Sequence, residues 1–433
     1  MFHQPVVAPS NGSPRSLRFI LAITAGLFAS GSALAETISV NFETPAYVVG
    51  PVNAQDGWKA LGSVGSGCAL YDVGVVTNTY GFANFGGQSL RDSNARTSGC
   101  FGDQTFSKAL ANEAGESLAN NASPGGAPIM SSGLRQPHFE ASWEFASTVP
   151  GAEQSGLSVV ASADRGDGAR MNWLQMTDTP GGLGVNFYDY VDNAPLGSEA
   201  DPAKGCDVED DFFFTQVATG LSRTTTHSIR MTLDLVEGPA NDVVKIYVDG
   251  TLRHTGTSWE DYFRWCEGLG GPYDQGYGSN ESRTIDSILF RTGGGAQPAT
   301  LGKGFLIDNL VITSSARPIR IDVRPNNSQN QVNTNAKQLV PIAILGEPGF
   351  DPVVDVDQDS VVVRGASPIS TKFDVGDVNG DGLRDLTLYF RARGIRSPTP
   401  TECVDPAATL VLDGATLQGA PFTGTDHVAW LGC

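Results

Sequence analysis

Apolar and polar residues alternate along much of the chain, with the period of two that is typical of a half-buried strand. The clearest example runs from residue 229 to residue 235, and residues 244–248 continue it. Asp249-Gly250 then supplies the residues of a tight hairpin turn. Similar runs predict further strands at residues 38–42, 139–145, 170–176, 184–190 and 305–312. The pattern therefore indicates an all-β fold.

One short run breaks this alternation. Phe106, Leu110, Ala114 and Leu118 are four residues apart, which is the spacing of one face of a helix. Gly115 lowers the helix propensity of the run. We expect a single short helix here, attached to a protein built of sheets.

Residues 314–318, where serine, alanine and proline occur together, have the composition of a domain boundary, and a second block of strands follows them. The later strands are expected at residues 319–323, 339–345, 360–364, 385–390 and 409–412, with a turn at Asp413-Gly414. About a hundred residues of this kind suit a second, smaller β-sandwich. We therefore predict one domain over residues 36–315 and another over residues 316–433.

The N-terminus has the features of an export signal. Arg15 and Arg18 precede a short apolar run, which ends in an A-x-A cleavage pattern at residues 33–35. We expect a signal peptide over residues 1–35 and a mature protein that is secreted, in the periplasm or outside the cell. An uncleaved anchor is the alternative, although the run is short for a bilayer. No later stretch resembles a membrane span.

Charge and cysteine content agree with this location. The formal charge of −19 argues against nucleic acid and anionic membranes as partners. Six cysteines without a C-x-x-C motif fit an oxidising compartment better than a zinc site. Pairing of neighbours in sequence would give the disulfides Cys68–Cys100, Cys206–Cys266 and Cys403–Cys433.

Two longer segments carry a family resemblance. Residues 223–265 (RTTTHSIRMTLDLVEGPANDVVKIYVDGTLRHTGTSWEDYFRW) and residues 303–313 (KGFLIDNLVIT) resemble bacterial secreted domains of the concanavalin A-like, or laminin G-like, jelly-roll class. The resemblance covers residues 36–315 and implies two curved antiparallel sheets. The class includes lectins, carbohydrate-binding modules, glycosidases and lyases, so it leaves the function open.

The C-terminal part is similar to a small accessory module of bacterial and archaeal surface or secreted proteins. The similar pieces are IRIDVRPNN, KQLVPIAILG, FDVGDVNGDGLRDLTLYF and the last two cysteines. This resemblance implies an extracellular accessory domain and assigns it no chemistry of its own.

Residues 377–385 match the pattern D-x-N-x-D-G-x-x-D, which is typical of a calcium-binding loop. Its oxygen ligands would be the side chains of Asp377, Asn379, Asp381 and Asp385 and the carbonyl of Leu383. The loop departs from an EF-hand at its twelfth position, which is leucine, so a further ligand such as Asp374 would have to help. A turn that binds no metal is the alternative. We predict calcium as the cofactor.

Aromatic residues gather between residues 259 and 277, among glycines and prolines that indicate a loop. Exposed rings there could stack on sugars, which makes the following residues candidate ligand-binding positions: Trp259, Tyr262, Trp265 and Tyr273. The alternative is that they cap the sandwich as part of its core. Trp173, Tyr188 and Tyr190 lie on two paired strands and could line a concave face or pack between the sheets.

Catalytic motifs for serine hydrolases, zinc proteases, phosphate loops and dinucleotide binding are absent from the sequence. An unfamiliar carboxylate pair, such as Glu260 with Asp286, remains open. The first hypothesis is a non-catalytic binding or adhesion protein, with a glycan as its partner. The second is a glycosidase or polysaccharide lyase, and the third is a purely structural surface protein.

Overall fold

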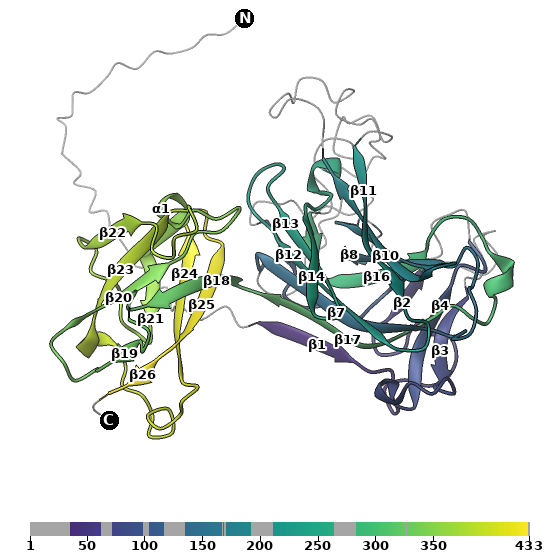
Figure 1. The fold of residues 1–433 in the computed structure, drawn as a ribbon, viewed down its shortest axis with the longest axis horizontal. Helices are drawn as coiled ribbons and strands as arrows, with labels where there is room; N and C mark the ends of the chain where they lie inside the picture. Colours follow the sequence, from purple (N-terminus) through teal and green to yellow (C-terminus); the bar gives the residue numbers. More distant parts are fainter. Residues whose placement is uncertain are drawn as a thin grey trace, which may run out of the picture. The chain divides into compact units, whose positions relative to one another are not determined.

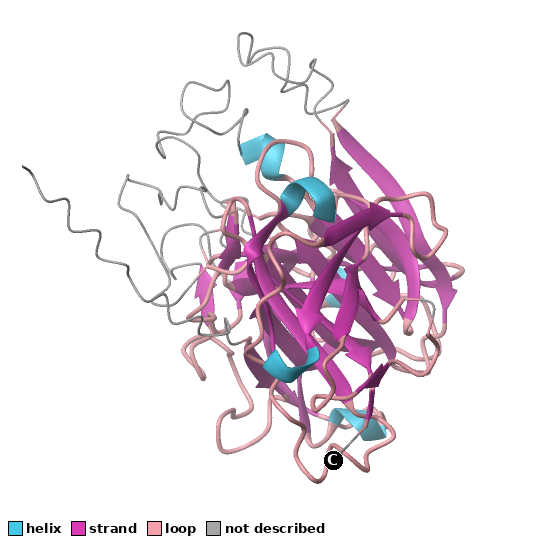
Figure 2. Cartoon of the chain, turned by 90° about the vertical axis from the view of Figure 1, so that its left-hand side faces the viewer, coloured by secondary structure: helices cyan, strands magenta, loops and turns pink. Residues whose placement is uncertain are grey.

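The structure is a computed structural model that describes residues 35–61, 72–97, 104–116, 135–166, 168, 170–191, 211–263, 283–325 and 327–431. Strands make up nearly all of its regular structure (Figure 2). Helical structure in the described ranges occurs as short turns, among them one turn of α-helix and three 3-10 turns: α1 (Pro352–Asp355), η1 (Ala83–Phe85), η3 (Pro298–Thr300) and η4 (Ala392–Gly394). Within the described ranges, no helix is long and apolar enough to cross a membrane. The predicted all-β fold class is confirmed.

The strands from β1 to β17 form a jelly-roll sandwich of two large sheets (Figure 1). The first sheet has the order β14-β13-β12-β7-β17-β4-β3, and β1 pairs with β17. Its strands are β1 (Glu36–Val40), β3 (Asp72–Thr77), β4 (Gln88–Ser93), β7 (His138–Ser147), β12 (His227–Asp234), β13 (Val243–Val248), β14 (Thr251–Gly256) and β17 (Phe305–Ser315).

The second sheet has the order β11-β10-β9-β8-β16-β5-β2. Its strands are β2 (Lys59–Leu61), β5 (Gln104–Phe106), β8 (Ser158–Asp164), β9 (Trp173–Thr179), β10 (Gly182–Tyr190), β11 (Phe212–Leu221) and β16 (Ser287–Thr292). A separate short ladder joins β6 (Ala114–Gly115) to β15 (Thr284–Ile285).

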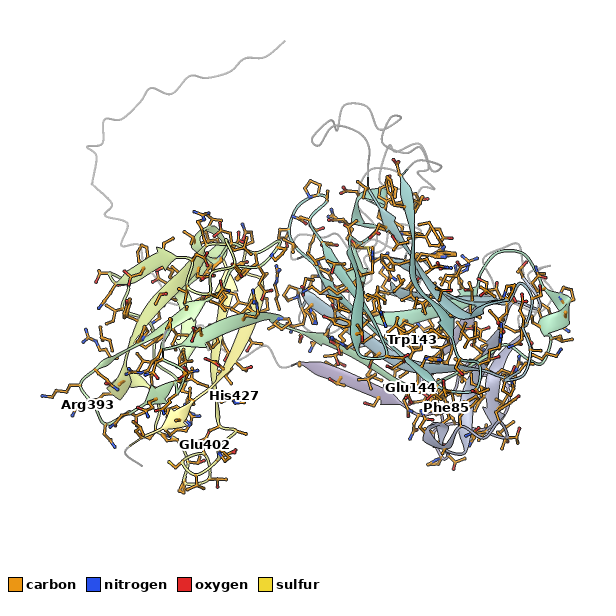
Figure 3. The ribbon with its side chains drawn as sticks, viewed as in Figure 1. Phe85, Trp143, Glu144, Arg393, Glu402 and His427 are labelled. Carbon is orange, nitrogen blue, oxygen red and sulfur yellow. The ribbon has the colours of Figure 1, made fainter. Side chains whose placement is uncertain are left out.

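Apolar side chains from both sheets fill the space between them. Phe290 of β16 lies parallel to the ring of Trp58, with ring centroids 6.4 Å apart, and meets Trp143 of β7 edge-on at 5.8 Å. All three side chains are buried, and Trp143 is labelled in Figure 3. Each aromatic side chain of this kind removes roughly 150–250 Å² from water, so this layer holds the two sheets together.

The strands from β18 onward form the second, smaller β-sandwich, with the order β21-β24-β25-β18-β20-β23-β22. Residues 317–320 of β18 pair in parallel with β25, whereas residues 321–323 pair antiparallel with β20, so β18 passes from one half of the sandwich to the other. The strands are β18 (Arg317–Val323), β20 (Leu339–Ile344), β21 (Val356–Val363), β22 (Phe373–Gly376), β23 (Asp385–Arg391), β24 (Thr409–Thr416) and β25 (Pro421–His427), with a small parallel pair of β19 (Gln331–Val332) and β26 (Ala429–Trp430).

The two sandwiches have separate cores. Their main clusters of buried apolar residues extend from Val40 to Ile312 and from Ile319 to Trp430. Only Ala316 separates β17 from β18. The division of the chain at residues 315 and 316 stays a prediction.

Two other sequence predictions fall mainly outside the described residues. The signal peptide stays a prediction because residues 1–34 are not described. Cys403 is the one cysteine that lies within the described ranges, and it is not free. The three disulfide pairings also stay predictions, since the following cysteines lie outside the described residues: Cys68, Cys100, Cys206, Cys266 and Cys433.

Most of the predicted strands are present close to their predicted bounds. Residues 229–235 fall largely in β12, and residues 244–248 fall in β13. The hairpin turn that follows is also confirmed, because Asp249 and Gly250 both have positive φ angles, 50° and 74°. Such angles belong to the tight turns that match the twist of the flanking strands.

The predicted helix is wrong over residues 106–116, the described part of that run. Phe106 ends β5 and Ala114 lies in β6. Leu110 is buried. Its backbone N–H donates to the carbonyl of Asp286 at 2.7 Å, and this hydrogen bond holds the segment beside the start of β16. The apolar residues spaced four apart are therefore buried by contacts with strands distant in sequence and do not form one face of a helix.

The predicted turn at Asp413-Gly414 is also wrong, since both residues lie inside β24. A side chain at Gly414 would come within 2.5 Å of the ring of Phe422 on the neighbouring strand. Glycine is therefore needed here for the close approach of an aromatic ring. The chain reverses later, near Gly419, where φ is 89°.

A β-bulge interrupts the pairing of β17 with β7 between Asp308 and Val311. Asn309 takes a positive φ of 51° there. Asp308 is buried and accepts hydrogen bonds from the backbone of Asn309 at 2.7 Å and from the Ser89 hydroxyl at 3.2 Å. Burial, together with the nearby Glu43 and Glu144 carboxylates, outweighs these bonds and raises the pKa of Asp308 to about 8.

This shift predicts a pH dependence of stability. The folded state binds a proton at Asp308 more tightly than the unfolded state does, so its contribution is complete below pH 3.8 and is lost as pH rises toward 8. We expect Asp308→Asn, which cannot ionise, to flatten the fall in unfolding free energy between pH 5.5 and 8.5, as measured by urea unfolding. The exposed Asp359→Asn is the control, and equal pH slopes for both variants would contradict the prediction.

Candidate functional site

The second sheet presents one face to the core and the other away from it. Leu174 and Met176 of β9 and Phe187 of β10 are fully buried core residues. Because successive side chains of a strand point to opposite faces, Trp173 and Tyr188 point away from the core. They belong to the outer face of β9, β10 and β11, which we call the β9–β11 face.

Three aromatic residues form a row across the β9–β11 face. Trp173 is opposite Tyr188 in the β9–β10 register, and Tyr188 is opposite Phe214 in the β10–β11 register. The rings of Tyr188 and Phe214 lie 5.4 Å apart. Trp173 and Tyr188 are half-buried, whereas Phe214 is 55% exposed. The row is therefore accessible at least at its β11 end.

A row of amides lies beside the aromatic row, two residues away from it on each strand. Gln175 is opposite Asn186, which in turn is opposite Gln216. The Asn186 side-chain nitrogen donates to the Gln175 carbonyl oxygen at 3.3 Å, and Gln175 donates to the hydroxyl of Ser158 at 2.7 Å. These hydrogen bonds orient the amides next to the rings.

Two arginines border the aromatic row on the side of β8 and β16. The guanidinium carbons of Arg170 and Arg291 each lie 5.4 Å from the centroid of a Trp173 ring. Arg291 belongs to β16 and is opposite Val160, which is itself opposite Gln175. The register thus leads from Gln175 across the fully buried Val160 of β8 to Arg291. Both arginines are half-buried.

The predicted ligand-binding residues are placed differently. Trp259 is 8% exposed, stacks on Trp173 with ring centroids 5.9 Å apart, and donates its indole N–H to the carbonyl of Tyr188 at 2.8 Å. Tyr262 is half-buried and contacts the rings of Trp259 and Phe212. Both residues therefore pack against the side chains of the outer face and do not themselves form an exposed surface. Trp265 and Tyr273 lie outside the described residues.

Buried carboxyl groups anchor the turn that carries Trp259. One oxygen of Glu260 accepts the backbone N–H groups of Asn241 at 3.0 Å and Asp242 at 3.3 Å. Asp261 accepts the N–H of Ala240 at 3.3 Å. Burial and the neighbouring carboxylates of Asp242, Glu116 and Asp261 raise the pKa of Glu260 to about 10, so this carboxyl group is neutral at pH 7.

Asp286, the other half of the suggested catalytic pair, has a different set of neighbours. Burial and the carboxylates of Asp164 and Glu113 raise its pKa to about 7. The side chain is 9% exposed. Its charged neighbours are not those of Glu260, so the structure gives no sign that the two carboxyl groups act together.

The predicted calcium loop connects β22 to β23. Asp377 accepts the backbone N–H groups of Gly380 and Asp381 with one oxygen, at 2.7 and 3.1 Å, and that of Gly382 with the other at 3.0 Å. Asp381 accepts the N–H of Leu383 at 2.9 Å. The carboxylates therefore shape the turn themselves, and Gly380 and Gly382 provide its positive φ angles of 78° and 86°.

The remaining residues of the loop are occupied by protein groups. Asp385 is buried and accepts the backbone N–H groups of Gly346 at 2.8 Å and Val378 at 2.6 Å. The Asn379 side-chain nitrogen donates to Asp381 at 2.8 Å, and Arg320 approaches the same carboxylate at 3.5 Å. The backbone N–H of Leu383, together with Asn379 and Arg320, lowers the pKa of Asp381. Nowhere in the described ranges are three His, Cys, Asp or Glu side chains gathered as they would be around a metal ion.

Sequence reasoning named Trp173 and Tyr188, but it left open whether they line a concave face or pack between the sheets. It missed Phe214, Gln175, Asn186, Gln216 and Arg291. Strand alternation alone would have placed Gln175 on the side of Trp173, since the two are two residues apart. The alignment of β10 with β11 could not be found in this way, because the register shifts between Leu183 and Asn186.

Comparisons with known proteins do not identify a family. No family model matches the chain, and no curated protein matches it. Among solved structures, the chain is similar to an alginate lyase, Aly36B, with 13% identity, a TM-score of 0.33, and coverage of 65% of this chain and 98% of that one. It is also similar to a carbohydrate esterase from Shiga toxin-encoding bacteriophage phi24B (14% identity, TM-score 0.31, coverage 65% and 98%) and to the carbohydrate recognition domain of Emp47p (10% identity, TM-score 0.27, coverage 64% and 94%). Likenesses at these scores do not assign a function.

The burial of Trp259 leads to a prediction about stability. Trp259→Ala should lower the free energy of unfolding by about 3–5 kcal/mol, because it removes a buried ring, its stacking contact with Trp173 and its hydrogen bond. Phe214→Ala, at an exposed position, should cost less than about 1 kcal/mol. Urea unfolding of both variants measures the difference, and similar small losses would mean that Trp259 is not part of the core.

Proposed function

We propose that this protein is a secreted, non-catalytic binding protein that holds glycan chains on the β9–β11 face. The observation that carries the proposal is the pairing of an aromatic row, Trp173, Tyr188 and Phe214, with a row of amides on the same face. Sugar rings have apolar faces and polar edges. Aromatic rings can pack against the faces, while amides donate and accept hydrogen bonds at the edges.

The dimensions of the two rows support this assignment. Neighbouring strands lie roughly 4.8 Å apart and alternate residues of one strand roughly 6.6 Å apart. The aromatic row therefore extends over about 10 Å, enough for about two sugar rings in line, with the amides at one edge. A ligand bound in this way would run across the strands.

A purely structural protein would have no reason to expose the β11 end of this row. Phe214 is 55% exposed although it belongs to an edge strand, where an apolar side chain invites unwanted association. Binding of a ligand to the ring offers a reason for its position. The neighbouring Phe213 is also exposed, at 46%, but is opposite Asp189 in the register and so points to the other face.

An enzyme on the same fold is the second candidate function, and Asp286 is the observation that favours it. A carboxyl group with a pKa of about 7 can donate or accept a proton at neutral pH. The carboxylates that raise the pKa of Asp286 are those of Asp164 and Glu113, whereas the outer-facing positions of β9, β10 and β11, all of whose residues are described, carry no carboxylate beside the aromatic row. We therefore favour binding over cleavage of the glycan.

The proposal predicts a difference between two adjacent phenylalanines. Phe214→Ala should weaken glycan binding about tenfold, or 1–2 kcal/mol, because it removes one ring of the aromatic row. Phe213→Ala, on the same strand and similarly exposed, should leave binding unchanged. Affinity electrophoresis of the full chain in gels that contain different polysaccharides identifies a ligand, and titration calorimetry then compares the variants.

Incubation of the protein with the polysaccharide that it binds separates the two candidate functions. New reducing ends or unsaturated products in the wild-type sample, absent in Asp286→Asn, would establish the enzyme. Equal loss of binding in both phenylalanine variants would remove the β9–β11 face as the site.

We further propose that the loop at residues 377–385 binds calcium as a structural ion. The three carboxylates of Asp377, Asp381 and Asp385 lie within nine residues, and hard oxygen ligands of this kind suit Ca²⁺. The turn already has the glycine conformations that such a loop needs. Binding would require the Asn379 amide to rotate and Arg320 to leave Asp381, so that the ion replaces these two donors.

Calcium should raise the melting temperature of the full chain relative to EDTA. An ion that binds only the folded state stabilises it by about 2.7 kcal/mol at a hundredfold excess over the dissociation constant. Because the loop lacks the acidic twelfth ligand, we expect a dissociation constant of about 10⁻⁴–10⁻³ M. Asp381→Ala should remove the calcium effect, and the exposed Asp359→Ala should keep it. Identical melting in millimolar calcium and EDTA would show that the loop is only a turn.

A further inference from the structure

A pocket of about 240 Å³, which we call the Arg317 pocket, lies beside the start of β18. Residues 33–433 form one compact unit, and the pocket takes its walls from both sandwiches of that unit. The apolar part of the wall includes Leu235 of the jelly roll and Phe350 and Phe422 of the smaller sandwich, all of them buried. A protein cavity of about 150 Å³ is large enough to bind benzene, so this pocket has room for a small organic molecule.

Two buried polar atoms in the wall of the Arg317 pocket meet no hydrogen-bond partner among the described residues. One is Nε of Arg317, a residue that is 7% exposed and whose Nη1 donates to the carbonyl of Gly349 at 3.2 Å. The other is Oδ1 of Asn241. The side-chain nitrogen of Asn241 donates to the carbonyl of Glu237 at 2.7 Å, which identifies the oxygen as the end without a partner. The wall therefore offers one donor and one acceptor, and a buried group of either kind is destabilising until it is paired.

Gly349 shows that the donor and the acceptor belong to one place. A Cβ on this glycine would lie 3.9 Å from the Asn241 carbonyl oxygen and 4.0 Å from Nη2 of Arg317, so both residues surround the same point. It would also lie 3.3 Å from a methyl group of Val243. Gly349 has a φ of 77°, a conformation that favours glycine. The turn that needs a glycine thus also keeps this part of the wall free of a side chain.

The charges around the pocket favour an uncharged ligand. Arg317 brings a positive charge to the wall, and Glu237 and Asp355 bring carboxylates. Burial acts to raise the pKa of Asp234, but His138 and Arg317 outweigh it and the pKa is lowered. The charge of Arg317 is therefore already balanced by carboxylates of the protein, and an anionic ligand would meet the same carboxylates. A ligand suits this wall if it presents a neutral acceptor to Nε.

We propose that the Arg317 pocket binds a small uncharged molecule through an N-acyl group, that is, through a secondary amide. The amide carbonyl accepts from Nε of Arg317, the amide N–H donates to Oδ1 of Asn241, and the acyl carbons contact the apolar wall. A carboxylate has no donor for Asn241, and an ammonium group has no acceptor for Arg317. The pocket shares no residue with the β9–β11 face, so this inference does not rest on the proposed glycan binding.

Acylated sugars and acylated amino acids both carry this group, and the test includes one of each. N-acetylglucosamine is compared with glucose, and N-acetyl-leucine amide with leucine amide, by titration of the full chain followed by NMR. We expect at least one N-acyl compound to bind at least about tenfold more tightly than its counterpart, because it pairs both buried polar atoms. Binding of only one of the two compounds identifies the source of the acyl group.

Two variants test whether the pocket is the site. Arg317→Gln removes the Nε donor, and Ala420→Leu fills the pocket from another part of its wall and leaves the arginine in place. Each should reduce the preference for the N-acyl compound about tenfold. The exposed Arg391→Gln, in the same sandwich, is the control and should keep it.

The outcomes that overturn the proposal are distinct from a failure of the proposed function. Equal binding of each N-acyl compound and its counterpart, or no binding of any of the four, overturns the ligand assignment. A preference that survives in Ala420→Leu and in Arg317→Gln places the N-acyl group elsewhere on the protein and overturns the pocket. None of these results bears on the binding of polysaccharides to the β9–β11 face, which the two phenylalanine variants test.

Discussion

The alternation of side chains along β9, β10 and β11 is the constraint on which the site depends. Each strand must turn one set of side chains inward, where Leu174, Met176 and Phe187 fill the core against the first sheet. The opposite set points away from that core, and part of it packs against the segment around Trp259. Register between the strands gathers that set into rows, so that residues far apart in sequence, such as Trp173 and Phe214, serve one surface.

The sequence predicted the elements of this sheet better than it predicted their partners. Strand periodicity located β9, β10 and β12 and the hairpin at Asp249-Gly250, because these signals are local. It failed at Leu110 and Gly414, where residues from other strands determine the conformation. The aromatic row was missed for the same physical reason. Its existence depends on pairing between strands, and extra residues in β11 shift its register with β10 in a way that no local pattern records.

Burial of acidic groups gives the jelly roll several carboxyl groups with raised pKa values. Asp286, Asp308 and Glu260 all owe the shift first to removal from water and then to other carboxylates nearby. Removal from water is costly for an ion, so each of these carboxyl groups keeps its proton to a higher pH than an exposed carboxyl group does. The formal negative charge of the sequence therefore overstates the charge of the folded protein.

The segment around Trp259 shows how one local signal can fit two roles. Its aromatic residues suggested either a ligand-binding loop or a cap of the sandwich core, and the described part packs against the aromatic row. Glu260 and Asp261 fix the turn to the backbone at residues 240–242, and Trp259 then presses on Trp173 and bonds to the carbonyl of Tyr188. A neutral Glu260 can hold this turn without leaving a charge uncompensated beside three other carboxylates. The turn thereby limits the motion of the first two rings of the row, and a ligand that binds rings already held in place loses less entropy in ordering them.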